Sequence, residues 1–237
     1  MSKKTLVVMG NGPSLADIDF DLLNRFDTFG LNAAYRAYKK LDWWPTYHGC
    51  FDYVVTKSHR DNFKNLVEGN NPIKKFFYLE QVSNSKKMQK IDLIPFRTSD
   101  KWNSDVSDFQ SFNDGGNSGV NASQVGVCLG YEKIILVGVD CNYVEHVEGV
   151  SVTPDGRLEV TEDIQKNPNY WFDDYQQKGD RFNVPQETAF HFIPWNEFAS
   201  KAYSRGIEVV NCSTETKLRC FRRSTLEKEL SLWRFLF

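Results

Sequence analysis

The sequence predicts an α/β domain with a mainly parallel sheet and helices on both faces. Short apolar runs that end at Gly, Asn or Asp recur along the chain, as in strands buried on both faces. Segments of helical pattern separate most of them, and such alternation favours parallel strands joined by crossover helices. Polar residues follow the strands, where ligands bind in sheets of this kind. We therefore expect a Rossmann-like fold with a ligand site.

Four strands are expected in the first half of the chain, at residues 6–9, 28–31, 46–51 and 76–79. Each is short and apolar and stops at a residue that favours a turn. Helical patterns follow the first three strands. Ser14 is the expected N-cap of the first helix, because its hydroxyl can accept a hydrogen bond from a free backbone N–H.

The alternation resumes after residues 81–117, which are poorly patterned apart from a candidate edge strand at 93–96. A helix is expected to begin with Ser118 as its N-cap and to run to about Leu129. Gly130 suits the end of this helix, because glycine readily adopts the left-handed conformation found there.

The remaining elements lie on either side of an irregular segment. The strand at 134–137 is the most clearly apolar of the chain, and a last strand is expected at 207–210. The helix between them should span about 185–205. Pro194 lies inside that helix and should kink or split it, because proline lacks the N–H that a helix uses.

The irregular segment is residues 141–183, which we call the lid segment. It is rich in Gly and Pro but also contains a cluster of aromatic residues among acidic ones. A loop of this length inside a compact domain is typically functional or disordered. The aromatic residues favour a lid that folds over a ligand. We therefore expect a Rossmann-like catalytic domain at 1–213 that includes the lid, followed by a basic amphipathic C-terminal segment at 214–237.

Composition excludes several classes of protein. The 237 residues are 41% hydrophobic and 25% charged, as in an ordinary globular domain. A net charge of -2 argues against a dedicated nucleic-acid binder. The five scattered cysteines favour a reduced, cytoplasmic protein. The apolar run at 6–9 is too short for a signal peptide, and no run approaches the ~20 residues of a membrane-spanning helix.

Candidate ligand contacts follow the predicted strands, and the carboxyl ends of parallel strands meet at one edge of the sheet. They are Asn11, Asn32, Asp52, Asp140 and Asn211, all of which could equally serve ordinary turns. Two glycine-rich helix entries, Gly10-x-Gly12 before Ser14 and the stretch from Gly115 to Gly119, are suited to a phosphate, because glycine allows close backbone approach and a helix N-terminus presents free N–H groups.

Two of the four histidines lie in or just after the lid segment. His191 and His146 are both general-base candidates, because an imidazole titrates near neutral pH. We prefer His191. No pair of histidines has the spacing of a metal site, and Asp-x-Asp occurs only within the first predicted helix, so no metal site is expected.

Several of these motifs together resemble the bacterial lipooligosaccharide sialyltransferases of glycosyltransferase family 42. The matching features are Gly10-Asn-Gly-Pro-Ser-Leu15, Asn32, Ser118-Gly-Val, Leu129 to Asp140 and Pro168-Asn-Tyr170. A wider group is also similar: flagellin nonulosonate transferases and domain-of-unknown-function 115 proteins, which resemble hydroxymethylpterin diphosphokinases. The lid sequence from Asn167 to Arg181 looks closer to this wider group.

The resemblance implies metal-independent, inverting transfer from a CMP-activated nonulosonic acid during synthesis of a surface glycan such as lipopolysaccharide. It places the nucleotide against Asn11, Asn32 and Ser118-Gly119, with Asp52 where the family has a third asparagine. It also places Asp140 beside the ribose or cytosine. Tyr143 and Tyr170 would steady the leaving phosphate, and His191 would be the base. Gly10, Gly12 and Ser14 complete the expected nucleotide site.

The expected partners are a CMP-sugar donor and a glycan or glycolipid acceptor, with no further cofactor. Assembly of the protein into a homo-oligomer is also considered. Basic and aromatic residues from Lys217 to Phe237 suggest peripheral contact with the inner membrane face, and the alternative is a terminal helix packed on the sheet. Two other functions also remain open: a diphosphokinase-like phosphotransferase using Mg²⁺ with Asp140, Asp173 and Asp174, and a noncatalytic nucleotide-binding module.

Overall fold

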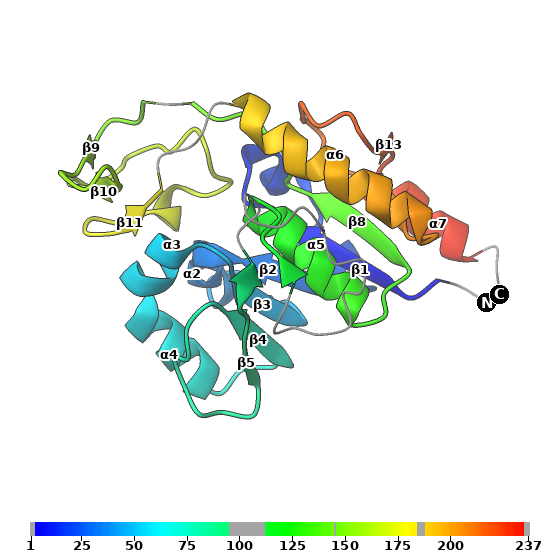
Figure 1. Ribbon diagram of the computed structural model, residues 1–237, viewed down its shortest axis with the longest axis horizontal. Coiled ribbons are helices and arrows are strands. Elements are labelled where there is room, and N and C mark those ends of the chain that lie inside the picture. Colours follow the sequence, from blue (N-terminus) through cyan, green and yellow to red (C-terminus); the bar gives the residue numbers. More distant parts are fainter. Residues whose placement is uncertain (1–2, 95–111, 145, 184–187, 235–237) are drawn as a thin grey trace.

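A computed structural model describes residues 3–94, 112–144, 146–183 and 188–234. Its centre is an eight-stranded sheet in which all neighbours are parallel, in the order β13-β12-β8-β1-β2-β3-β4-β5 (Figure 1). The strands are β1 (Thr5–Met9), β2 (Asp27–Leu31), β3 (Tyr47–Cys50), β4 (Lys75–Tyr78), β5 (Met88–Lys90), β8 (Lys133–Val137), β12 (Glu208–Asn211) and β13 (Arg222–Arg223).

The order in which strands are added to the sheet reverses at β1. Strands β1 to β5 follow one another to one edge, and β8 then pairs with the other side of β1, with Val7 opposite Ile135. The loops that leave β1 and β8 therefore depart to opposite sides. Open α/β sheets bind ligands at such a switch point, beyond the carboxyl ends of the strands.

Helices cover both faces, as the sequence predicted. Alternate residues of β1 enter different cores: Leu6 and Val8 pack with α5 and α6, and Val7 and Met9 pack on the opposite face. That second face is covered by η1, α1, α2, α4 and α7. The helices are η1 (Pro13–Asp17), α1 (Phe20–Leu23), η2 (Asn32–Ala34), α2 (Tyr35–Tyr38), α3 (Tyr53–Ser58), α4 (Arg60–Glu68), α5 (Ser118–Cys128), α6 (Thr188–Ser204) and α7 (Leu226–Arg234).

Two local expectations were wrong, and a third was wrong in part. The helix does not split at Pro194: α6 continues through it, and the buried proline ring packs beside Gly116. Ser14 does not cap a helix: η1 follows Gly12, and Asp19 caps α1 instead. Ser118 is the first residue of α5, and the cap is Asn117, whose side chain accepts from the Val120 N–H at 2.9 Å. The expected helix start at residue 185 lies outside the described residues.

The lid segment contains a small antiparallel sheet that the sequence did not predict. Its strands are β9 (Val150–Val152), β10 (Leu158–Val160) and β11 (Arg181–Phe182), and η4 (Asp173–Tyr175) precedes β11. β11 lies beside α3 at one end of the main sheet (Figure 1). A second pair of short strands, β6 (Leu93–Ile94) and β7 (Phe112–Asn113), is parallel.

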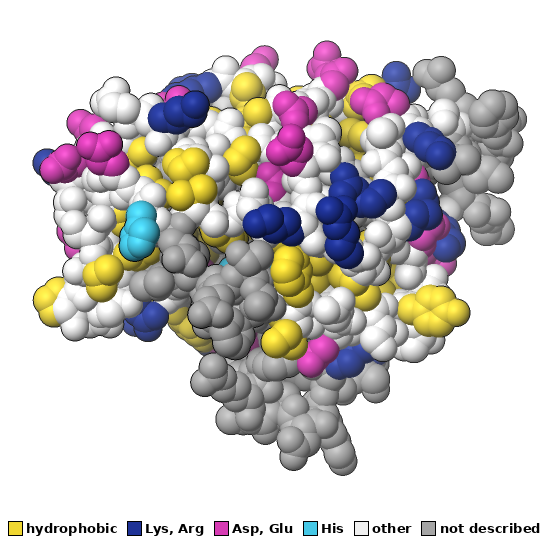
Figure 2. Space-filling model, turned by 90° about the horizontal axis from the view of Figure 1, so that it is seen from above, with side chains coloured by type: hydrophobic (Ala, Val, Ile, Leu, Met, Phe, Trp, Pro, Cys, Tyr) yellow, Lys and Arg dark blue, Asp and Glu magenta, His cyan; other side chains and the backbone are white. Residues whose placement is uncertain are grey.

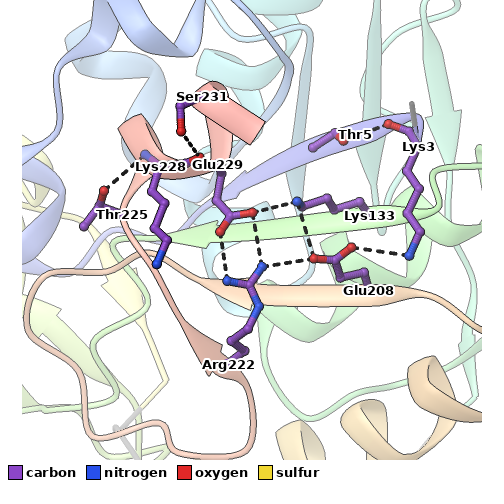
Figure 3. A network of polar contacts seen from close by, with 9 residues as sticks. All are labelled: Lys3, Thr5, Lys133, Glu208, Arg222, Thr225, Lys228, Glu229 and Ser231. Carbon is purple, nitrogen blue, oxygen red and sulfur yellow. Dashed lines mark hydrogen bonds and ion pairs between the residues drawn. The ribbon is translucent and has the colours of Figure 1, made fainter. Parts of the chain in front are cut away.

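The C-terminal segment packs on the main sheet through the residues that the structure describes. β13 pairs with β12, and Leu226 of α7 is 2% exposed in the core. Glu229 is completely buried, with its carboxylate 2.6 Å from Lys133 Nζ and 2.9 Å from an Arg222 nitrogen (Figure 3). Buried charge pairs therefore join α7, β8 and β13. The domain boundary at 213 stays a prediction.

Candidate active site

A cavity of about 730 Å³ lies at the carboxyl ends of β1, β2, β3 and β8, where the lid segment meets the main sheet. Its walls include most of the expected site residues: Gly10, Asn11, Gly12, Asn32, Asp52, Ser118, Gly119, Asp140, Tyr143, Tyr170 and His191. Ser14 and Asn211, the remaining candidates, do not line it. Residues from distant parts of the sequence thus meet in one cavity. His146, the other base candidate, is exposed and does not line it.

The turn after β1 requires glycine because it packs directly on the turn after β8. The Gly12 N–H donates to the Gly138 carbonyl at 2.9 Å. A Cβ atom at Gly10 would stand 2.2 Å from the Gly138 oxygen, and one at Gly12 would stand 2.5 Å from Asp140 Cγ. These two glycines allow the backbone of the turn to form part of the cavity wall.

Asp140 is held by Ser14 across this contact. Its carboxylate accepts from the Ser14 N–H at 2.9 Å and from the Ser14 hydroxyl. Burial raises the pKa of Asp140, although both hydrogen bonds from Ser14 oppose that rise. Ser14 is itself buried, so the structure places it behind the cavity wall, where it orients Asp140.

The asparagines after β1 and β2 stand next to each other at the switch point. Asn11 donates through Nδ2 to the Leu31 carbonyl at 3.1 Å, and its buried Oδ1 has no hydrogen-bond donor among the described residues. Asn32 adopts a positive φ of 53°, and its Nδ2 lies 3.4 Å from Ser118 Oγ. The ends of two strands and the start of α5 therefore form one polar wall.

The entry to α5 is held by residues that sequence reasoning did not select. Asn117 caps the helix, and the fully buried Asn121 accepts from the Gly115 N–H at 2.7 Å. Asn121 also donates to Asp114 at 2.9 Å. The α5 N-terminus, which carries partial positive charge, borders the cavity and suits an anion there.

Asp52 lines the cavity, but its carboxylate already accepts several hydrogen bonds. Oδ1 caps α3 by accepting from Val54 and Val55 at 2.8 and 3.2 Å, and Oδ2 accepts from Asn183 of the lid segment at 2.8 Å. Asp52 therefore connects the body of the domain to the lid. A contact between Asp52 and a nucleotide stays a prediction.

Two tyrosines and a histidine lie at the lid side of the cavity. The rings of Tyr143 and His191 are 5.2 Å apart between centroids, and Tyr170 stacks on Tyr175 at 3.9 Å. Tyr143 is 38% exposed, and burial raises the pKa of Tyr170. Phenols are protonated at neutral pH, so both side chains can donate hydrogen bonds to an anion.

A further buried cluster, also missed from the sequence, joins the lid to α2 and to the junction between α3 and α4. Arg36 pairs with Asp180, and His59 Nε2 lies 3.4 Å from the same carboxylate. The Tyr35 hydroxyl lies 3.0 Å from His59 Nδ1. Burial lowers the pKa of His59 to about 4, so its ring is neutral at pH 7. Arg36 is then the cation that balances Asp180.

The acidic residues considered for a magnesium site do not meet. Asp140 lines the cavity, whereas Asp174 is paired with Lys40 and neither it nor Asp173 lines the cavity. Across the described part of the chain, no three His, Cys, Asp or Glu residues are grouped so that they could hold a metal ion.

Comparisons with known proteins support the fold. No protein-family model and no curated protein matches the chain. Among solved structures, the sialyltransferase CstII from Campylobacter jejuni, in complex with the substrate analogue cytidine-5'-monophosphate, matches with a TM-score of 0.51 and 18% identity over 94% of this chain and 86% of that chain. Its complex with CMP-3FNeuAc matches with a TM-score of 0.50, 18% identity and the same coverage of both chains.

A second glycosyltransferase also shares the fold. The MAf glycosyltransferase from Magnetospirillum magneticum AMB-1 matches with a TM-score of 0.52 and 12% identity. The match covers 98% of this chain but only 36% of that one, so the chain spans about a third of the length of that enzyme. The chain therefore has a Rossmann-like fold that it shares with glycosyltransferases.

Proposed function

We propose that the protein is a glycosyltransferase whose donor is a CMP-activated nonulosonic acid. The observation that carries the proposal is the single cavity in which the glycine turn, Asn11, Asn32 and the α5 N-terminus meet Tyr143, Tyr170 and His191. One side of the cavity carries polar groups that can contact a nucleotide, and the other side carries side chains that can assist glycosyl transfer. The fold shared with CstII, whose solved complexes contain CMP and CMP-3FNeuAc, supports this choice of donor.

In this proposal the nucleotide lies against the carboxyl ends of β1, β2 and β8. The free Asn11 Oδ1 accepts a hydrogen bond from the base or ribose, which would satisfy an otherwise unpartnered buried acceptor. The phosphate lies near the N-terminus of α5 and the phenols of Tyr143 and Tyr170. Preorganised donors of this kind stabilise the charge that grows on a leaving phosphate, so the reaction needs no metal.

Transfer is a single displacement. His191 takes the proton from an acceptor hydroxyl, whose oxygen attacks the anomeric carbon of the donor as the bond from that carbon to the phosphate oxygen breaks. CMP leaves with the electron pair, and the configuration at the anomeric carbon inverts. The lid segment keeps water out of the cavity, since water would otherwise hydrolyse the donor.

The test is incubation with CMP-sialic acid, with and without EDTA, while CMP release is measured. We expect release that EDTA does not change and that Asn11→Ala slows. Release that is abolished by EDTA and restored by Mg²⁺ would contradict the metal-independent mechanism. Tight CMP binding without turnover of CMP-sialic acid, alone or with glycan acceptors, would favour the noncatalytic module.

We also propose that the acceptor is a glycan or glycolipid. A membrane would present such a glycolipid, and we propose that exposed basic residues of the C-terminal segment contact an anionic membrane surface. Lys217, Arg219 and Lys228 are exposed. In Figure 2 Lys and Arg side chains lie among acidic and hydrophobic ones on the face seen from above. Within the described ranges no helix has the length and apolar character needed to cross a bilayer. Replacing the three residues by Gln should reduce sedimentation with anionic vesicles at low salt, and unchanged sedimentation would exclude this contact.

A further inference from the structure

Arg36 on α2 makes contacts with two separate parts of the lid segment. Its guanidinium pairs with both carboxylate oxygens of Asp180, with one distance of 2.9 Å, and also donates to the Tyr175 carbonyl at 2.8 Å. The side chains of Arg36 and Asp180 are only 10% and 12% exposed. A planar guanidinium can satisfy several acceptors at once in a fixed geometry, which an ammonium group cannot reproduce.

The residues that Arg36 holds form part of the cavity wall. Asp180 and Tyr175 both line the cavity. The Tyr175 ring stacks on Tyr170 at 3.9 Å with an angle of 15° between the planes. Tyr175 is therefore held at its carbonyl and at its ring. Arg36 itself does not line the cavity.

The rest of this lid region is anchored in the same way. Asp180 also accepts from the Gln177 N–H at 2.8 Å, the Arg181 N–H donates to Ser58 at 2.9 Å, and Asn183 donates to Asp52. Arg36 is the contact that joins this anchored stretch to Tyr175, and hence to Tyr170.

We propose that Arg36 is a positioning residue of the transfer site, which sets the place of the Tyr170 hydroxyl through the stacked Tyr175. The inference rests on the proposed function, in which Tyr170 donates to the leaving phosphate. Arg36 acts on the bond-breaking step more than on nucleotide affinity, because the base and ribose are held by strand ends that Arg36 does not contact. Displacement of a reacting group by about 1 Å can cost on the order of 10²-fold in rate.

The experiment compares Arg36→Ala, Arg36→Lys and Asp180→Asn with wild type. For each variant, CMP titration gives the affinity and the concentration of binding sites, and turnover of CMP-sialic acid gives kcat per site and KM. Arg36→Ala should lower kcat per site by about 10²-fold, in line with the cost of such a displacement, with a much smaller change in CMP affinity. Arg36→Lys should recover part of that loss, and Asp180→Asn should fall between wild type and Arg36→Ala.

Lys40→Met is the matched control. Lys40 also joins the α2 region to the lid, through Asp174, but both side chains are more than half exposed and neither lines the cavity. This variant should keep the wild-type kcat. The proposal is overturned if Arg36→Ala keeps wild-type kcat per site, or if Lys40→Met loses as much as it does. If Arg36→Ala does not fold, Arg36→Lys and Asp180→Asn decide, and wild-type kcat in both overturns the proposal. Failure of the wild type to turn over any CMP-sugar would instead contradict the proposed function.

Discussion

Buried charged residues hold both the lid segment and the C-terminal segment in place, the first through helix α2 beside the carboxyl ends of the strands and the second at the amino end of β8. Asp180 of the lid pairs with Arg36 beside the cavity at the carboxyl ends of the strands. Glu229 of α7 pairs with Lys133, the first residue of β8, and with Arg222 of β13 (Figure 3). The lid pair thus adjoins the candidate active site, whereas the C-terminal pair lies at the other end of β8.

This difference shows that similar chemistry can have different consequences. Removing one partner of a buried ion pair destabilises the fold in either place, although Lys133 would keep a second ion pair with Glu208 at 3.4 Å. At the C-terminal segment we expect the consequence to be confined to folding stability. At the lid, under the proposed function, we expect the same kind of change also to move groups that line the cavity and so to lower the transfer rate.

The largest expected effect lies on the cavity side of the comparison. His191→Ala should lower the transfer rate by about 10²–10⁴-fold, because a general base contributes that much to such a reaction. Its CMP affinity and melting temperature should change little, because the nucleotide contacts come from other elements. Steady-state kinetics, CMP titration and thermal unfolding measure the three quantities. His146→Ala is the control, since His146 is exposed outside the cavity. A His191→Ala transfer rate close to that of wild type would show that His191 is not the general base.

On the C-terminal side, Glu229→Gln should destabilise the fold without changing activity. Lys133 would keep its charge while 9% exposed, with Glu208 at 3.4 Å as its remaining ion-pair partner, so we expect a loss of about 1–3 kcal/mol in the free energy of unfolding in urea. Lys3→Met is the control: it breaks the more exposed pair with Glu208 and should cost less than about 1 kcal/mol. A Glu229→Gln variant with intact stability, or with a lowered kcat, would contradict the claim that the Glu229 ion pairs act on stability alone.

The pH dependence of folding stability gives a second test of the Glu229 ion pairs. Burial alone would raise the pKa of Glu229, but hydrogen bonds from Arg222 and Lys133 outweigh it and lower the pKa from 4.5 to about 2. A lowered folded-state pKa stabilises the protein above the unfolded-state value, and this stabilisation is lost as the pH falls from about 5 toward 2. Urea unfolding of wild type should lose free energy over that window, and Glu229→Gln should lose less. Equal slopes for both proteins would contradict the assignment.

A smaller effect is expected where the cavity contacts the nucleotide. Asn11→Ala and Asn32→Ala should each weaken CMP binding by about 1–3 kcal/mol, as for the loss of a hydrogen bond in a buried site. Both proteins should remain folded by circular dichroism. Calorimetric titration with CMP measures the change, and Asn196→Ala, an exposed asparagine on α6 outside the cavity, serves as the control. Wild-type affinity in both folded variants would show that these strand ends do not hold the nucleotide.

The sheet and the polar strand ends could be predicted because they depend on local patterns. Buried parallel strands give continuous apolar runs, and the carboxyl ends of such strands meet at one edge, so Asn11 and Asn32 come together without further information. The lid strands could not be predicted in this way. β9, β10 and β11 have three, three and two residues, which is too short for an alternating pattern to appear.

The anchoring residues were missed for a related reason. Arg36 and Asp180 are 144 positions apart, and although Asp180 lies in the lid sequence that resembles the wider group, no sequence pattern links it to Arg36. Asp52 was expected as a nucleotide contact because it follows a strand, but an aspartate immediately before a helix is also a good N-cap, and the structure uses it for that purpose. Pair formation across such distances in the sequence depends on the whole fold.

The central claim, that the cavity binds a cytidine nucleotide, is tested most directly by the melting temperature of the full chain with CMP, UDP or ATP. At about 100 times its dissociation constant, a ligand stabilises the folded state by about 2.7 kcal/mol. For a chain of this size that raises the melting temperature by roughly 5–10 °C. We predict a rise of this size with CMP, a smaller one with UDP and ATP at the same concentration, and a loss of the CMP effect in Asn11→Ala. No rise with CMP at millimolar concentration, or an equal rise in Asn11→Ala, would contradict the account.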